Sequence, residues 1–431
     1  GVSPTFNLLT SVMDDMRPEN KYLHLMDEQE AITKAQALLN RPGDANVSPL
    51  AVYRRAAKAD SVQQRRPNVV LIMMESMSAK FMKHFGQSET LTPFLDSLYT
   101  RSISFRNFYS AGIHTNHGLY ATLYSFPAMM KRNLMKGSVI PRYSGLPTVL
   151  KENGYYNLFF MTHEGQYDNM NAFFRTNGYD EVFSQEDYPA DKVVNSFGVQ
   201  DDFLYDYAIP VLNQRAATGQ PFFATLLSIS NHPPYVIPPF FHPKTSEPEM
   251  QIVEYADWAL RQFFEEARKQ PWFDNTIFVL EGDHGKLVGD AECELPESYN
   301  HIPLMIYSNR IQPEEKTAFG GQVDIQPTIL GLLNIDYLQN NFGVDLLKEE
   351  RPCMFYTADN MVVGRNDTLL YLYNYETQQE LTYDIGNGKL NAVPMDDSFL
   401  PLKEYSFSML QSAEFLVKHG KTLNSIPFTQ Q

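Results

Sequence analysis

The feature that most constrains the fold is an apolar run that ends abruptly in charged residues. Residues 276–280, Thr-Ile-Phe-Val-Leu, read as a buried strand, and Glu-Gly-Asp-His-Gly-Lys follows at 281–286. Asp283 and His284 are poor core residues, because carboxylate and imidazole resist burial unless they are paired or bind a metal. The flanking glycines let the backbone turn sharply and approach a ligand. Taken alone, the pair fits a metal site and a strand-end turn capped by aspartate equally well.

Three further apolar segments end in the same way. The segments and the polar groups that follow them are 67–74 with Glu75, 105–112 with 113–118, and 222–230 with 231–235. Open α/β sheets bind ligands outside the carboxyl ends of their strands. One polar strand end is ordinary, but four of them indicate a single site at the carboxyl edge of one sheet.

The order of the segments predicts an α/β fold. From 67 to about 340, strands alternate with helices such as 146–154 and 253–264, which is typical of a largely parallel sheet covered by helices. Beyond 341 the pattern changes. Segments 368–375 and 380–384 read as antiparallel strands, and a closing helix follows around 406–418.

We therefore predict three parts. They are an N-terminal helical connector at 1–66, an α/β domain at 67–340 and a small α+β subdomain at 341–431. The connector contains a helix at 27–39, which Asn-Arg-Pro-Gly at 40–43 should end.

Six sequence segments together resemble one protein family. They are NVVLIMMES at 68–76, LTPFLDSLYTRSISFRNFYSAG at 91–112, SNHPPY at 230–235, EGDHG at 281–285, HIPLMIYS at 301–308 and VDIQPTILGLL at 323–333. In this order they resemble the extracellular catalytic domain of the lipoteichoic acid synthase-like phosphoglycerol transferases, in the alkaline phosphatase and sulfatase superfamily. The resemblance covers roughly residues 67–340. It implies that this part is an alkaline phosphatase-like catalytic domain.

The resemblance also implies roles for individual residues. Glu75, Asp283 and His284 would bind one divalent metal ion, and Thr115 would be both the nucleophile and a fourth ligand. His232 would contact the phosphoryl group. Mixed oxygen and nitrogen ligands suit manganese best here, with zinc or magnesium as alternatives. Coordination would activate the weakly nucleophilic threonine hydroxyl.

Two departures from the related families bear on specificity. Sulfatases make an aldehyde nucleophile from a cysteine or serine, and residues 114–118, His-Thr-Asn-His-Gly, contain neither, which disfavours sulfatase activity. The synthases also carry Trp-Asn-Arg at a head-group site, where Asp-Asn-Met stands here at 168–170 without an arginine. His163, Glu164 and Asp168 are then candidates for substrate binding. Ordinary strand-end polar residues are an equally good interpretation of the first two.

Three other positions leave alternatives open. His301 precedes the strand 302–307 and would either contact substrate or support residues that do. His114 and His117 flank Thr115 and would point in different directions if a helix begins there, so one of them has room to face the site. A structural role for both is the favoured interpretation. Lys286 fits a phosphate contact and a solvated surface lysine equally well.

The composition argues against some classes of binding partner. It does not indicate the cellular compartment, which only the resemblance implies. The net charge of −16 argues against nucleic acid and against simple electrostatic docking on an anionic membrane. Two cysteines, Cys293 and Cys353, lie in different segments, and their pairing cannot be read from the sequence. The chain starts at Gly1 and shows neither a signal peptide nor an apolar run of membrane-spanning length. The resemblance implies an upstream transmembrane region, with this domain periplasmic or at the cell surface.

Three functions follow as hypotheses. The favoured one is metal-dependent transfer of a phosphoglycerol-type or phosphoethanolamine-type head group from a phospholipid to a glycan or lipid acceptor, through a covalent phospho-threonine. The alternative is a phosphodiesterase or phosphatase that uses the same site with water as the acceptor. A non-enzymatic surface domain is the least favoured, because the complete set of Glu75, Thr115, Asp283 and His284 would have no use there.

Overall fold

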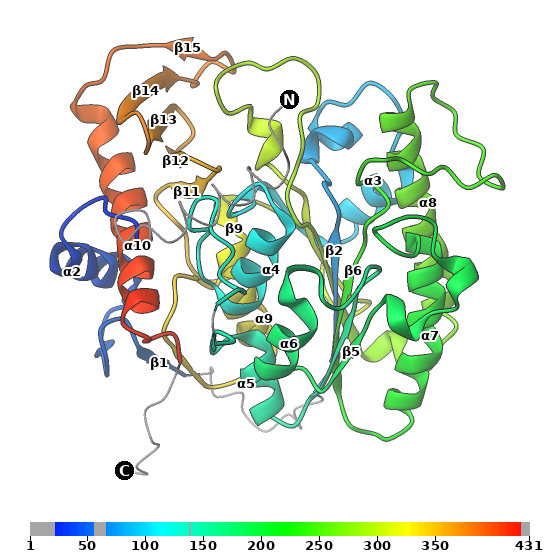
Figure 1. Cartoon of the computed structure of the whole chain (residues 1–431). Coiled ribbons are helices and arrows are strands. Elements are labelled where there is room, and N and C mark those ends of the chain that lie inside the picture. The colour runs from blue at the N-terminus through cyan, green and yellow to red at the C-terminus, as the bar shows by residue number, and fades with distance from the viewer. Residues whose placement is uncertain (1–21, 56–65, 138, 424–431) are drawn as a thin grey trace, which may run out of the picture.

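The computed structural model describes residues 22–55, 66–137 and 139–423, and Figure 1 shows its layers. A central sheet of eight strands runs in the order β5-β4-β6-β2-β7-β8-β3-β9. The strands are β2 Asn68–Met74, β3 Ile103–Tyr109, β4 Tyr156–Phe160, β5 Glu181–Phe183, β6 Phe222–Leu227, β7 Thr276–Gly282, β8 Leu304–Tyr307 and β9 Glu314–Gly321. Neighbouring strands pair in parallel except on both sides of β8, which is antiparallel to β7 and β3. The largely parallel sheet expected from the sequence is therefore confirmed.

Both faces of this sheet are buried under helices. All seven residues of β2 are buried: Val69 and Leu71 pack into one core, and Val70 and Ile72 into the other. Strands covered on both faces read as continuous apolar runs rather than alternating ones. This is why 68–74 reads as an unbroken apolar segment.

The helices form a layer on each side of the sheet (Figure 1). One side carries α3 Pro93–Tyr99, α7 Asp201–Ala216 and α8 Pro248–Ala267. The other carries α4 Thr115–Tyr124, α5 Leu146–Glu152, α6 Met170–Thr176 and α9 Ile325–Leu332. Short 3₁₀ helices in the connections are Ala79–Phe81, Lys83–Phe85, Tyr167–Asn169, Gln185–Asp187, Ala190–Lys192, Phe273–Asn275, Glu297–Tyr299, Gln322–Asp324 and Asp397–Phe399.

A second, smaller sheet follows the first along the chain. Its five strands are consecutive and antiparallel: β11 Met354–Thr357, β12 Met361–Arg365, β13 Leu369–Asn374, β14 Gln379–Asp384 and β15 Asn391–Ala392. The helix α10 Leu400–Lys418 packs on β11 and β12. The antiparallel strands and the closing helix were both expected, although α10 begins earlier than residue 406.

The described part of the predicted connector packs on the rest of the chain. Its helix α2 Glu28–Leu39 is capped by Asp27 and lies against α10, while β1 Val52–Arg54 pairs with β10 Tyr337–Gln339. Residues 1–21 and 56–65 of that connector, and 424–431 of the C-terminal subdomain, lie outside the described residues. The boundaries at 66 and 340 stay a prediction.

The topology brings four strand ends to one edge. β6, β2 and β7 are parallel neighbours, and β3 runs the same way because both β7 and β3 are antiparallel to β8. The segments after these strands therefore emerge at the same edge, as the sequence predicted. Within the described ranges, no helix combines the length and apolarity needed to span a bilayer. Cys293 and Cys353 are both free thiols.

Candidate active site

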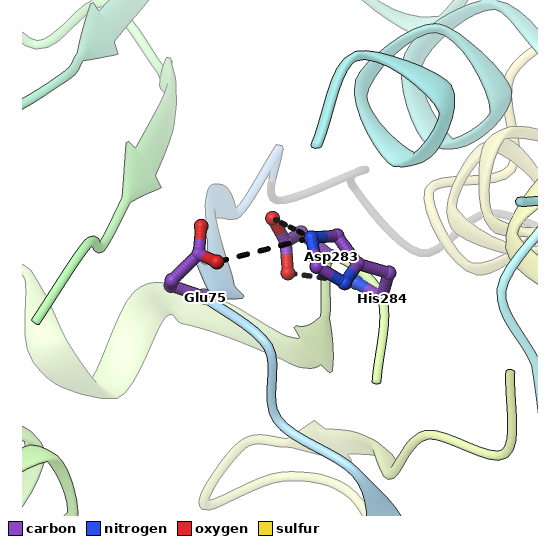
Figure 2. Close-up of side chains that lie close together, drawn as sticks. All are labelled: Glu75, Asp283 and His284. Atoms are coloured by element: carbon purple, nitrogen blue, oxygen red, sulfur yellow. Dashed lines mark hydrogen bonds and ion pairs between the residues drawn. The ribbon is translucent and has the colours of Figure 1, made fainter. Parts of the chain in front are cut away.

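Glu75, Asp283 and His284 come together at this edge (Figure 2). Each offers one ligand atom, and these atoms all lie within 4.8 Å of one another. Glu75 directly follows β2, and Asp283 and His284 directly follow β7. Since Met74 pairs with Gly282 in the parallel register, the next residue on each strand is an acid. The register of two buried strands thus sets the two carboxylates side by side.

The geometry of the cluster leaves one imidazole nitrogen facing the carboxylates. His284 Nε2 lies 3.8 Å from Glu75 Oε1 and 3.6 Å from Asp283 Oδ2. His284 Nδ1 lies 2.7 Å from the carbonyl oxygen of Gly285, which assigns the ring proton to Nδ1. A histidine held in this way presents the Nε2 lone pair to a metal.

The residues present fit a divalent cation. Glu75 and Asp283 are almost completely buried, and Asp283 Oδ2 has no hydrogen-bond partner among the described residues. Burial first, and the neighbouring Asp283 second, raise the pKa of the Glu75 carboxyl well above its usual range. Two carboxylates buried together are costly without a compensating positive charge. A cation bound by two carboxylates and one imidazole removes this cost, and manganese and zinc accept such a ligand set.

Thr115 is the first residue of α4 and faces this cluster. Its Oγ1 lies 3.4 Å from Glu75 Oε2. The amino end of a helix carries a partial positive charge that favours phosphate and other anions. Gly118 lets α4 approach so closely, since a Cβ there would lie 2.2 Å from the carbonyl oxygen of Asp283. The threonine, the acid and the helix end therefore converge on one point.

The two histidines beside Thr115 differ in burial, although their ring centroids lie only 5.0 Å apart. His117 is fully buried, and burial, followed by the charges of His114 and His284, lowers its pKa to about 3, so it is neutral. His114 is exposed, and its Nε2 lies 2.6 Å from Oδ1 of Asp359, in the turn between β11 and β12. Of the two rings, that of His117 is therefore the one that packs into the interior.

His232 lies at the end of β6, beside the cluster. Its Nδ1 lies 2.6 Å from the carbonyl oxygen of Pro233, and its ring packs on Phe197 with centroids 4.0 Å apart. Burial lowers its pKa, partly offset by the hydrogen bond to Pro233; the charge of His284 lowers it further, and that of Asp283 raises it. It also lines a small cavity whose walls include Val194, Phe197, Val199, Ile229 and Val236. This position is compatible with the phosphoryl contact expected for His232, which stays a prediction.

The proposed substrate residues at 163–168 border the same region. His163 is buried, its Nδ1 lies 3.1 Å from the carbonyl oxygen of Glu164, and burial lowers its pKa. Asp168 Oδ2 lies 3.5 Å from Nδ2 of Asn116, the neighbour of Thr115. Asp168 Oδ1 lies 2.7 Å from Lys136 Nζ. A lysine from a distant loop thus supplies a cation near the stretch where the expected arginine is absent.

His301 is held mainly by backbone and aromatic groups. Its Nε2 lies 2.8 Å from the carbonyl oxygen of Arg106, and its ring lies between those of Phe85 and Tyr109, each 5.1 Å away. It precedes β8, whose amino end lies at the carboxyl end of β7. Of the two roles left open for His301, these contacts favour supporting the site over touching substrate.

Several residues that hold the site escaped the sequence-based reasoning. Ser76 donates its N–H to Asp283 Oδ1 at 2.8 Å and its hydroxyl to Glu75 Oε1 at 2.7 Å. Ser228 Oγ accepts the Glu75 N–H at 3.0 Å, and Gln322 Nε2 donates to the Asp283 carbonyl at 2.7 Å. Ser76 and Ser228 lie at strand ends, and this position in the sequence could have indicated that they belong to the site. Gln322 and Lys136 gave none, because only the fold brings them near.

A protein-family model matches residues 67–335, and its description is sulfatase. The chain belongs to the sulfatase family. This sulfatase-family chain is 24% identical over 315 residues to lipoteichoic acid synthase 2 of Bacillus subtilis (strain 168), covering 66% of this chain and 47% of that protein. The chain spans about half the length of the curated relatives that it matches.

Two solved structures share the fold of this sulfatase-family chain. A protein of the alkaline phosphatase superfamily from Vibrio parahaemolyticus superposes with a TM-score of 0.82 at 26% identity, covering 93% of this chain and 98% of that one. The lipoteichoic acid synthase LtaP from Listeria monocytogenes gives 0.70 at 21%, covering 82% and 93%. The alkaline phosphatase-like fold and the likeness to lipoteichoic acid synthases are thereby confirmed.

Proposed function

We propose that the protein transfers a phosphoglycerol-type head group from a phospholipid to a hydroxyl group of a glycan or lipid, through a covalent intermediate on Thr115. The observation that supports it most is the placement of Thr115 Oγ1 within 3.4 Å of Glu75, at the border of the Glu75–Asp283–His284 cluster. A hydroxyl beside a candidate metal site and at a helix amino end is well placed to attack phosphorus. A phosphoethanolamine-type head group would use the same site.

Members of this family catalyse sulfuryl as well as phosphoryl transfer, and the residues at the site favour one of the two. Relatives that match the chain are named lipoteichoic acid synthases. Segment 114–118 contains neither cysteine nor serine, so the aldehyde nucleophile of sulfatases cannot form there. Thr115 is the remaining hydroxyl of this segment, which favours phosphoryl over sulfuryl transfer.

The first half-reaction forms a bond from Thr115 Oγ to phosphorus and breaks the bond from phosphorus to the lipid oxygen. Thr115 loses its proton, and the diacylglycerol oxygen gains one as it leaves. A divalent cation held by Glu75, Asp283, His284 and Thr115 would supply a lower pKa for the hydroxyl and charge stabilisation for the phosphoryl oxygens. His232 would contact the phosphoryl group, and the amino end of α4 would favour the growing negative charge.

In the second half-reaction, an acceptor hydroxyl oxygen bonds to phosphorus and the bond to Thr115 Oγ breaks. The acceptor loses its proton, and Thr115 regains one. His163, Glu164 and Asp168 would bind acceptor hydroxyls, with His301 supporting that edge. The charge of Lys136 is already matched by Asp168 at 2.7 Å, which leaves little to attract a second phosphate. We therefore propose one transfer to a neutral acceptor rather than polymerisation of glycerol phosphate.

The proposed substrates imply a location and a set of partners. A phospholipid donor and a glycan or lipid acceptor meet at the outer surface of the cytoplasmic membrane, so we place this domain in the periplasm or at the cell surface. Anchoring would come from a transmembrane region of the full-length protein, upstream of this domain. The net charge of −16 agrees with a domain that does not bind nucleic acid.

Product sizing tests the proposal. The protein is incubated with Mn²⁺, a fluorescent phosphatidylglycerol analogue and a neutral oligosaccharide, and the products are separated by mass. A singly modified oligosaccharide is the expected product. Free glycerol phosphate as the main product, with acceptor in excess, would favour the phosphodiesterase alternative. A ladder of polyglycerolphosphate would contradict the single transfer, and an unconsumed lipid would contradict the proposed donor.

A further inference from the structure

Lys286 is anchored inward rather than solvated. It follows the Asp-His pair by two residues, yet its Nζ donates to Asn231 Oδ1 at 2.6 Å and to the Tyr235 hydroxyl at 3.1 Å. The same ammonium group lies over the Tyr235 ring, 4.7 Å from its centroid, and 5.4 Å from that of Phe81. A lysine that merely solvates a turn would not make two directed hydrogen bonds and two aromatic contacts.

Asn231 carries these contacts on to the candidate metal ligands. This side chain is buried, and its Nδ2 donates to the backbone carbonyls of Glu75 and Ser76, both at 3.1 Å. Since Lys286 occupies Oδ1, the amide nitrogen is the group left to face those carbonyls. Lys286 therefore fixes the orientation of the Asn231 amide.

The backbone that Asn231 clamps is the part of the site most in need of support. Ser76 has φ 50, in the left-handed region that non-glycine residues seldom adopt. In that conformation its N–H reaches Asp283 Oδ1 and its hydroxyl reaches Glu75 Oε1. The turn at Ser76 thus sets both carboxylates, and Asn231 holds the carbonyls on either side of it.

We propose that Lys286 is a positioning residue of the metal site, which acts through Asn231 to hold the Ser76 turn and thereby aim Glu75 and Asp283. The inference rests on the proposed function in one respect, that a divalent cation binds there. It adds a residue that orients Asn231 and whose side-chain hydrogen bonds go to Asn231 and Tyr235.

The direction in which one substitution changes the Mn²⁺ affinity separates this role from a simple charge effect. A positive charge near a cation site weakens cation binding, so its removal alone would tighten Mn²⁺ binding. If Lys286 positions the ligands, the neutral Lys286→Met should instead weaken Mn²⁺ binding by roughly tenfold, the usual scale for residues that orient metal ligands. Lys286→Arg, which can still donate to Asn231, should restore most of the affinity.

The experiment is calorimetric titration of the metal-free protein with Mn²⁺, without lipid or acceptor. Lys269→Met serves as the matched control, because Lys269 and its ion-pair partner Glu266 are both exposed. Asn231→Ala tests the same chain of contacts independently, in case Lys286→Met does not fold. The variant that combines Lys286→Met and Asn231→Ala should bind Mn²⁺ about as weakly as either single variant, since both substitutions break the same chain of contacts.

Three outcomes overturn the inference. They are unchanged or tighter Mn²⁺ binding by Lys286→Met, equal loss in Lys286→Arg, and additive losses in the double variant. If the wild type binds Mn²⁺ and any of these results is found, the positioning role is contradicted but the metal site is not. Absence of Mn²⁺ binding by the wild type contradicts the proposed metal site, and the inference with it. Failure of head-group transfer would leave the binding result standing.

Discussion

Thr115 is the residue on which the proposed chemistry depends. Thr115→Ala removes the bond-forming oxygen, so turnover of a lipid analogue should fall by at least about 10³-fold with the fold intact. Thr115→Ser should retain part of the activity. Turnover and circular dichroism check both. Near-normal activity of Thr115→Ala would move the nucleophile elsewhere, although Ser110 is a poor substitute because it is buried and donates to the Gly112 carbonyl at 2.8 Å.

The ligand set predicts one tightly bound divalent cation per chain. Elemental analysis of the purified protein, or of protein reconstituted with Mn²⁺, should give close to one equivalent, because the cation offsets two buried carboxylates. Asp283→Asn should lose most of it, since Asp283 Oδ2 would be replaced by a neutral group. A reconstituted protein with almost no metal would refute the site.

Individual residues differed in how well the sequence predicted them. Glu75, Asp283 and His284 were predictable because each directly follows an apolar strand, and parallel pairing then brings strand ends together. Lys136 was not, because its place beside Asp168 depends on how two loops fold over the sheet edge. Lys286 was noticed, but only the structure shows its side chain directed toward Asn231.

Among the elements, α4 approaches the end of β7 closely beside the site. Gly118→Ala adds a methyl group that would lie 2.2 Å from the Asp283 carbonyl, so α4 must shift away. We expect a loss of about 2 kcal/mol in unfolding free energy, the usual scale of overpacking, together with reduced kcat. Chemical denaturation and turnover measure both.

A control glycine separates this effect from that of any added methyl group. Gly386 lies in the loop after β14, and a Cβ there would meet the Thr368 side chain at 3.2 Å and Asp384 Oδ1 at 3.5 Å but no backbone atom within 4 Å among its nearest neighbours, so stability and turnover of Gly386→Ala should change little. Wild-type behaviour of Gly118→Ala would show that α4 does not need this close approach.

The helices and strands were easier to predict from the sequence than the direction in which the strands pair. Apolar runs and glycine stops identified the strands β2, β6 and β7 and the helices α5 and α8, because burial on both faces leaves a clear pattern. The antiparallel direction of β8 was not predictable, since a four-residue buried strand carries no mark of its direction. The start of α10 at Leu400 was also misplaced, although the proline in its first turn is a common feature of helix starts.

At the scale of the whole molecule, the N-terminal segment is tied to the region after β10. Arg41 Nε lies 2.8 Å from Glu349 Oε1, and its Nη2 also contacts the same carboxylate. Burial alone would raise the pKa of Glu349, but the paired hydrogen bonds and the charge of Arg41 lower it overall. A lowered folded pKa stabilises the protein above the unfolded value of about 4.5, and this contribution is lost as the pH falls below that value and through the lower folded pKa.

Arg41→Met should therefore destabilise the protein by about 1–2 kcal/mol at pH 7, with the difference from wild type shrinking below about pH 4.5. Urea denaturation at several pH values measures it. Arg261→Met, which breaks an exposed pair with Glu265, is the matched control and should change little at any pH. A difference that stays the same size as the pH falls from 7 to 3 would show that Arg41 acts through packing rather than through the ion pair.

The covalent phospho-threonine is the central claim, and mass spectrometry tests it most directly. The protein is incubated with Mn²⁺ and phosphatidylglycerol without acceptor, quenched in acid and digested. The account predicts that the peptide containing Thr115 gains the mass of one glycerophosphoryl group, and that Thr115→Ala gains none. Lipid turnover with an unmodified Thr115 peptide, or an adduct on another residue, would contradict it.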